Sequence, residues 1–120
     1  MKPGKEMDNL VTTTVLKWHL ENRPVMEDWD MVWVDEEGKG HGFDWQFKPS
    51  TNAEHALEVV DKFDAMNVKY FPGGVPEHKR WRVDLIIVKQ REDGVFKSKS
   101  CATLAEAICS AALKSVEEDK

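Results

Sequence analysis

Two clusters of residues in this chain carry side chains that could bind a small ligand. In the first, aromatic residues near the end of a predicted strand lead into a polar run before a predicted helix. Helix N-termini attract anions, because their first N–H groups are free and the helix dipole is positive there. This cluster therefore predicts a site for a nucleotide-like ligand. The alternative is that Ser50 or Thr51 only caps the helix. The candidate residues are Trp45, Phe47, Lys48, Ser50, Thr51 and Asn52.

The second cluster is basic. Arg80 and Arg82 flank Trp81, and further lysines and an arginine lie on the predicted hairpin that follows. An arginine beside an aromatic ring can stack on a base and pair with a phosphate. This pattern predicts a second place where an anionic ligand could bind. The alternative is a solvated sheet edge with Trp81 in the core.

Metal binding and catalysis are not favoured by the pattern. No two histidines lie four residues apart, and no Cys-x-x-Cys motif occurs. The acidic residues fall on predicted turns and solvent faces, and no catalytic signature for a serine or cysteine nucleophile is present. We therefore expect no metal, no cofactor and no enzymatic activity. The histidines are His19, His41, His55 and His78.

The composition is that of a single folded domain over residues 1–120, and we expect residues 1–6 and 117–120 to be flexible. The net charge of −5 argues against a nucleic-acid partner, because neutralising phosphates supplies most of that affinity. No apolar run approaches the roughly 20 residues of a membrane span. The two cysteines are too few for a disulfide framework and predict reduced thiols. These features predict a cytoplasmic protein with no membrane partner.

The first half of the chain predicts a helix and a strand pair. Apolar residues at helical spacing end before Pro24, and the residue preceding a proline resists helical backbone angles. Aromatic and polar residues then alternate, as in a strand with one buried face. The predicted elements are a helix over residues 8–20, an irregular stretch to about residue 30, a strand over 31–34, a turn over 35–40 and a strand over 41–48.

Capping boxes begin the other two predicted helices. Thr51 with Glu54, and Thr103 with Glu106, have the T-x-x-E spacing in which each side chain satisfies a backbone N–H of the first turn. Residues 80–90 become apolar on both faces, which is typical of a central strand covered on two sides. The predicted elements are a helix from 53 to about 67, strands over 68–71, 80–90 and 95–102, a hairpin turn at 93–94 and a final helix from about 104.

Four segments together resemble the phage ABA-sandwich domain family, which comprises small proteins encoded by phages and prophages. They occur in the family's order and span most of the chain, and the last is the most specific. The segments are DNLVTTTVLKW at 8–18, FKPSTN at 47–52 with the helix after it, WRV at 81–83 and ATLAEAICSAAL at 102–113.

The resemblance implies a phage origin and an α+β fold. That fold is a three-layer α-β-α sandwich, with a mainly antiparallel sheet and helices on both faces. The family has no established catalytic residues, so the resemblance supplies no site. The functional hypotheses therefore depend on the residues themselves.

We predict a small phage-encoded accessory protein that acts as a non-catalytic binding module in the cytoplasm of the infected bacterial host. Its ligand would be a small anionic, nucleotide-like molecule, such as a nucleotide-derived immune signal that it sequesters. The alternative is a protein–protein module that contacts a host protein or forms a homo-oligomer. Close approach of a partner helix would then use the small residues Ala105, Cys109 and Ala112.

Overall fold

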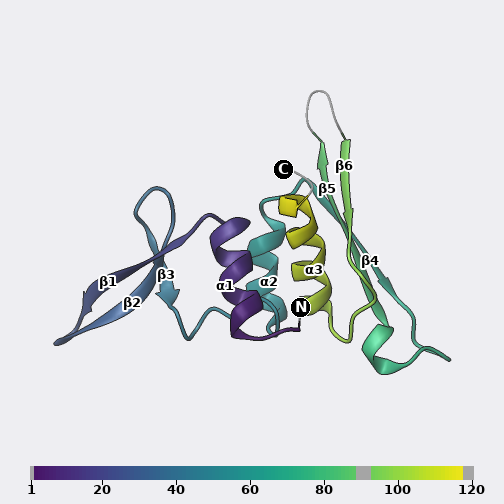
Figure 1. The fold of residues 1–120 in the computed structure, drawn as a ribbon, viewed down its shortest axis with the longest axis horizontal. Coiled ribbons are helices and arrows are strands. Elements are labelled where there is room, and N and C mark those ends of the chain that lie inside the picture. Colours follow the sequence, from purple (N-terminus) through teal and green to yellow (C-terminus); the bar gives the residue numbers. More distant parts are fainter. Residues whose placement is uncertain (1, 89–92, 118–120) are drawn as a thin grey trace.

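The computed structural model describes residues 2–88 and 93–117 of the chain. Three helices occupy the middle of the molecule, and a three-stranded antiparallel sheet lies on either side of them (Figure 1). The fold is therefore α+β with antiparallel sheets, as predicted, and its layers run sheet, helices, sheet. The elements are α1 (Lys5–Thr14), β1 (His19–Val25), β2 (Asp28–Val34), β3 (Gly40–Phe43), α2 (Ala53–Val60), β4 (Ala65–Tyr70), the 3-10 helix η1 (Glu77–Lys79), β5 (Trp81–Val88), β6 (Asp93–Lys97) and α3 (Leu104–Glu117).

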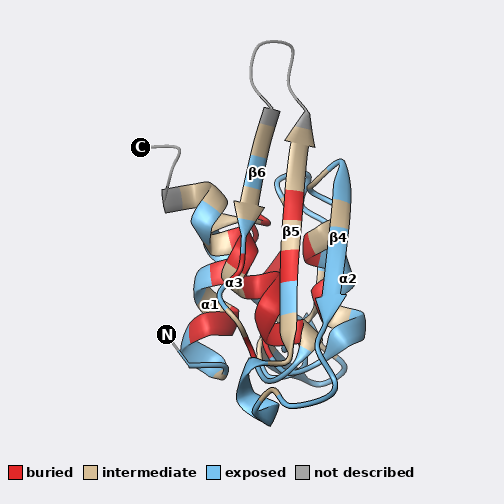
Figure 2. Cartoon of the chain, turned by 90° about the vertical axis from the view of Figure 1, so that its right-hand side faces the viewer, coloured by how far each residue is buried: buried red, intermediate tan, exposed pale blue. Residues whose placement is uncertain are grey.

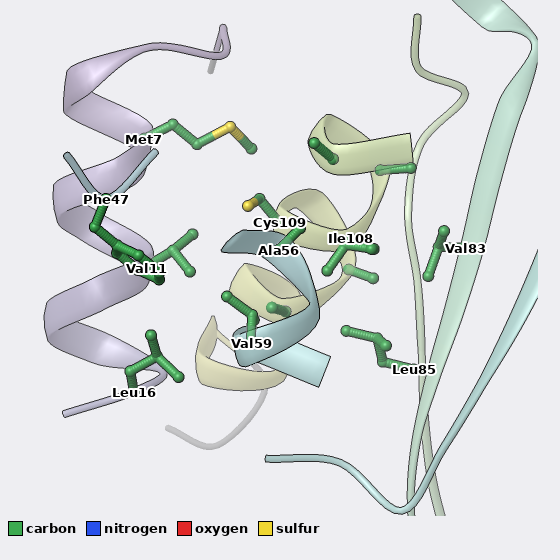
Figure 3. Packing of buried hydrophobic residues seen from close by; sticks show 14 of the residues in the cluster. Met7, Val11, Leu16, Phe47, Ala56, Val59, Val83, Leu85, Ile108 and Cys109 are labelled. Carbon is green, nitrogen blue, oxygen red and sulfur yellow. The ribbon is translucent and has the colours of Figure 1, made fainter. Parts of the chain in front are cut away.

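The core lies where α3 packs against its neighbours. Its small side chains let α1 and α2 approach on one side and β5 on the other (Figure 3). Ile108 of α3 is fully buried, as are Val59 of α2 and Leu85 of β5. The face of α3 that we proposed for a partner helix is filled within the chain instead. Its residues Ala105, Cys109 and Ala112 are at most 3% exposed.

Both cysteines are free and buried, as predicted. Burial raises the pKa of the Cys101 thiol to about 11 and raises the pKa of Cys109 further still. Because the thiolate is the reactive form, both side chains behave as small apolar groups at neutral pH.

The central strand β5 is covered by helix on one face. Val83 and Leu85 are buried and point toward α3 (Figure 3), whereas Arg82 is exposed and Ile86 is half-buried. Figure 2 shows the other face of β5, and none of the described α-helices lies over it. The prediction of a strand covered on both sides is therefore wrong for its second face. Within the described residues, no second layer of helices packs on that face of β5.

The first helix is shorter than predicted, and a strand was missed. The helix α1 includes Lys5 and Glu6 and ends at Thr14, where the hydroxyl groups of Thr12 and Thr14 donate to carbonyls four residues earlier. Such bonds compete with the backbone and weaken a helix. The predicted irregular stretch is the hairpin of β1 and β2. The polar residues and Pro24 of β1 do not form a strand-like pattern, so the sequence does not predict this strand. Because β1 lies at the edge of its sheet, a proline is tolerated there.

Two other elements also end early. The strand β3 stops at Phe43, because the Gln46 side chain accepts from the Phe43 N–H and folds residues 43–46 into a turn. The helix α2 stops at Val60, and by Asp64 the backbone N–H already donates to the Ile86 carbonyl of β5. Sheet pairing therefore replaces the helix predicted to run to about residue 67.

The capping predictions had different outcomes. Thr103 caps α3 as predicted, since its hydroxyl accepts from the Glu106 N–H, but the Glu106 carboxylate accepts from the Ala102 N–H, one residue before the cap. The box at Thr51 is wrong, because Asn52 caps α2 by accepting from the His55 N–H. The predicted turn at 93–94 is also wrong. Both residues pair within the sheet, and the connection over 89–92 lies outside the described residues.

Replacing Ile108 by alanine should destabilise the protein by about 2–5 kcal/mol, because it removes fully buried methyl groups at the centre of the core. Urea unfolding followed by circular dichroism measures this loss. The matched control is Leu57→Ala on α2, where the side chain is 49% exposed and the change should stay within about 0.5 kcal/mol. Equal losses in both variants would contradict the assignment of the core.

Candidate functional site

An open groove of about 690 Å³ lies between α2 and the segment that follows β3. We call it the aromatic groove, because five rings line it together with polar and charged side chains. Its walls come from the end of the α1–β1 connection, from β3 and its turn, and from the first two turns of α2. The lining residues are Trp18, His41, Trp45, Gln46, Phe47, Lys48, Asn52, Glu54, His55 and Glu58.

Four of these rings form a continuous ladder. His41 stacks on Trp18 with 4.0 Å between ring centroids and 6° between ring planes. Trp18 contacts Phe47 at 5.0 Å, and Phe47 stacks on His55 at 5.4 Å. Trp18 and Phe47 are buried, so they support the groove from below. Rings stacked in this way are held in place before any ligand arrives.

Trp45 is the ring most open to a ligand. It stacks on Phe43 at 5.4 Å with 7° between the planes, yet 56% of its surface stays exposed. The Gln46 turn causes this, because it breaks the strand alternation and directs Trp45 outward while Phe47 enters the core. The predicted strand over 41–48 with one aromatic face is therefore wrong beyond Phe43.

An acidic residue of the β2–β3 turn fixes His41. The His41 Nε2 and the Asp35 carboxylate lie 2.8 Å apart, and the same carboxylate accepts from the backbone N–H groups of Glu37 and Lys39. The hydrogen bond with His41, followed by that with Lys39, lowers the pKa of Asp35 from 3.8 to about 2. The turn predicted over 35–40 is thus confirmed, and it orients one ring of the ladder.

On the opposite wall, the backbone N–H of Lys48 donates to His55 Nδ1 at 2.9 Å. The neutral imidazole therefore carries its proton on Nε2. Next to it, the exposed carboxylates of Glu54 and Glu58 lie one helical turn apart. Lys48 is the single lysine or arginine among the described residues that line the groove. Because the groove has two carboxylates and one ammonium group, it favours a ligand ring that carries hydrogen-bond donors over a ligand with several phosphates.

The structure brings part of the first predicted cluster together. Trp45, Phe47, Lys48 and Asn52 line the aromatic groove. Thr51 lines an adjoining hollow of about 360 Å³, whose wall also includes Trp45 and Phe47.

Ser50 has a different role from the one that we proposed. It is fully buried, its N–H donates to the Asp8 carboxylate at 2.8 Å, and its hydroxyl accepts from the Gly4 N–H at 2.9 Å. Gly4 precedes α1, so Ser50 ties the start of that helix to the segment before α2. A ligand in the groove would not reach its hydroxyl group.

The second predicted cluster is not part of the groove. Trp81 contacts Tyr70 in the other sheet, with 4.6 Å between ring centroids and 46° between ring planes, and its backbone pairs with Cys101. The Arg80 guanidinium donates to the Val75 carbonyl, and Arg82 is exposed on β5. The helices separate this sheet from the groove (Figure 1). The two clusters therefore cannot act on one small ligand.

Three ring residues of the groove were missed from the sequence. The sequence predicts Trp18 within the first helix, over residues 8–20, and it presents His41 and His55 only as possible metal ligands. No local spacing joins these residues, because they come from three different elements. Within the described residues, no three histidine, cysteine or acidic side chains come together to hold a metal ion. No described helix is long and apolar enough to cross a membrane.

A comparison with known protein families identifies the family of this chain. The model of one family, the Phage ABA sandwich domain, matches residues 9–113. The chain belongs to the phage ABA sandwich domain family. The match covers all three helices and both sheets of this phage domain except the first residues of α1 and the end of α3. No curated protein and no solved structure matches it significantly.

The Asp35 carboxylate gives the phage domain a defined acid sensitivity. Because its pKa is about 2 in the folded protein and ordinarily 3.8, its ionised form stabilises the fold above about pH 4. This contribution is lost as the pH falls toward 2. We expect Asp35→Asn to melt below the natural protein at neutral pH, with a difference that shrinks between about pH 4 and pH 2.

Thermal unfolding across this pH range measures the effect. The matched control is Glu36→Gln, which changes an exposed carboxyl group of the same turn. It should leave the melting temperature at neutral pH close to that of the natural protein. A pH-independent difference for Asp35→Asn would contradict the role of its carboxylate.

Proposed function

We propose that this phage domain is a non-catalytic binding module that takes a flat, base-like ring into the aromatic groove. The observation that carries the proposal is the half-exposed ring of Trp45 beside a ladder of four aromatic rings in contact. Stacking on an aromatic side chain is worth about 1–3 kcal/mol per base and tolerates different bases. The ligand class is therefore a nucleoside or nucleotide derivative.

The charges of the groove refine this ligand. Glu54 and Glu58 can accept hydrogen bonds from amino groups on the ring, while Lys48 can pair with one phosphate. The groove has no arginine fork to hold several phosphates among its described lining residues. We expect the base, more than the phosphates, to supply the affinity.

A role in sequestering a nucleotide-derived immune signal of the host fits such a site. A protein that acts by sequestration needs affinity for its ligand but no chemical step. In this proposal the phage domain works in the cytoplasm of the infected bacterium. Its concentration there then sets how much signal it can remove.

Replacing Trp45 by alanine should weaken binding about 5- to 150-fold, the equivalent of one lost base–ring stack. Isothermal titration calorimetry against cyclic nucleotides and ADP-ribose derivatives measures the affinity. The matched control is Trp29→Ala, which removes a tryptophan that is 63% exposed on β2 and outside the groove.

Two outcomes would contradict the proposal. One is the absence of binding by every nucleotide in the panel. The other is binding that survives Trp45→Ala but is lost in Arg82→Ala, which would move the site to the second cluster on β5. Since the groove and that cluster share no residue, the two variants separate these sites.

A second candidate function is self-association through the β1–β2 hairpin. Met26 at its tip is fully exposed and adopts a positive φ of 56°, a conformation that favours glycine or asparagine. Trp29 lies close to it in sequence and is also largely exposed. The hairpin projects away from the helices (Figure 1), so its tip is open to a second copy of the chain. An exposed apolar side chain at an unfavourable backbone position favours a contact outside the chain.

Replacing Met26 by glycine should abolish this association without weakening the hairpin, because glycine adopts positive φ readily. Light scattering over a concentration series measures the molar mass of each variant. The control is Leu57→Ala, which removes an exposed apolar side chain from α2 and should leave the mass unchanged. A natural protein that stays monomeric at the highest concentration would contradict this second function.

A further inference from the structure

A second pocket, of about 270 Å³, lies away from the aromatic groove. We call it the lysine pocket. It forms where the chain leaves α1, where α2 turns into β4, and where the β5–β6 pair passes the end of α3. It shares no residue with the groove. The lining residues are Thr14, Val15, Lys17, Lys62, Phe63, Ile87, Gly94, Phe96, Ser115 and Val116.

The floor of the lysine pocket is apolar. Phe63 and Phe96 meet edge to face with 6.5 Å between their centroids, and Val15, Ile87 and Val116 surround them. None of these five side chains is fully buried, so the pocket leaves apolar surface accessible to water. Covering that surface with an apolar group would be favourable.

Gly94 keeps the floor open. A Cβ atom at this position would lie 2.9 Å from Cε2 of Phe96 and 3.0 Å from its Cζ, which is closer than side chains tolerate. The Phe96 ring therefore occupies space that only glycine leaves free. Any larger residue at position 94 would displace the ring and change the shape of the pocket.

The rim is basic. Lys17 and Lys62 come from separate connections, and neither forms an ion pair within the described parts of the chain. No carboxylate is among the described residues that line the pocket. Lys17 also has a positive φ of 62°, which is uncommon for a lysine. Two ammonium groups above an apolar floor match a molecule with an apolar body and a negatively charged end.

We infer that the lysine pocket binds a small amphiphilic monoanion, namely a carboxylate that carries a short aliphatic chain. The chain would cover Phe63 and Phe96, and the carboxylate would pair with Lys17 and Lys62. Because liquid water occupies about 30 Å³ per molecule, the pocket volume corresponds to about nine non-hydrogen atoms. A carboxylate of seven or eight carbons, which has nine or ten non-hydrogen atoms, is therefore the expected size. This inference is independent of the function proposed for the groove.

Titration of the full chain with octanoate tests the inference. Calorimetry should detect saturable binding of one octanoate per chain, and nuclear Overhauser contacts should connect its methylene groups to the rings of Phe63 and Phe96. Octan-1-ol lacks the charge and acetate lacks the chain, so both should bind at least tenfold more weakly. Octyltrimethylammonium carries the opposite charge and should not bind there.

Two variants test the residues. Lys62→Met keeps an unbranched side chain but removes the charge, and it should weaken octanoate binding about three- to tenfold. Gly94→Ala should weaken it as well, because the added methyl group displaces Phe96. Lys39→Met, in the turn before β3 and outside the pocket, is the matched control. Thermal unfolding of each variant verifies that it is folded.

Three results would overturn the inference. They are no binding of octanoate to the natural protein, octan-1-ol binding as tightly as octanoate, and an equal loss of affinity in Lys39→Met and Lys62→Met. Nucleotide binding in the aromatic groove is measured separately. Failure at one site therefore leaves the result at the other site unaffected.

Discussion

The rest of the structure depends on the close packing of α3. Its buried apolar residues are four alanines, Cys109 and one larger side chain, Ile108. Small side chains let α1, α2 and β5 approach this one helix from different sides, and this approach holds the two halves of the molecule together. The protein interior tolerates little empty space, so the neighbouring elements must supply the bulk that α3 lacks. Val11, Val59 and Leu85 do so, each from a different element.

The aromatic groove follows from how α1 is attached to this core. Buried hydrogen bonds link Ser50 to Gly4 and Asp8, so the segment before α2 cannot move independently of the first helix. This link brings Phe47 against Trp18, and the Gln46 turn then leaves Trp45 outside. Ser50, which we expected to contact a ligand, thus positions the aromatic rings of the groove.

Much of the fold could be predicted from local patterns, and most of the site could not. Some features depend only on residues that are close in sequence, so the sequence pattern predicts them. These features are the Thr103 cap, the apolar face of β5 and the turn at Asp35. By contrast, β1 is an edge strand with polar residues and a proline, and edge strands need little apolar patterning. The early end of α2 depends on pairing with β5, a contact distant in sequence. The ring ladder joins four separate positions, so only the tertiary fold could reveal it.

Most rings of the groove are already held in place by the fold, and this affects how tightly the groove could bind a ligand. Binding usually loses free energy when side chains must be immobilised, about 0.5–1.5 kcal/mol for each flexible one. Here Trp18 and Phe47 are buried, His41 is held by Asp35, and His55 accepts a hydrogen bond from the Lys48 backbone. Because these rings are fixed by the fold, a ligand loses little free energy in ordering them. Trp45 is the exception, since a single stacked neighbour supports it and more than half of its surface is exposed. A ligand that orders this ring would lose part of the stacking gain, so stronger support for Trp45 would raise affinity without any new contact to the ligand.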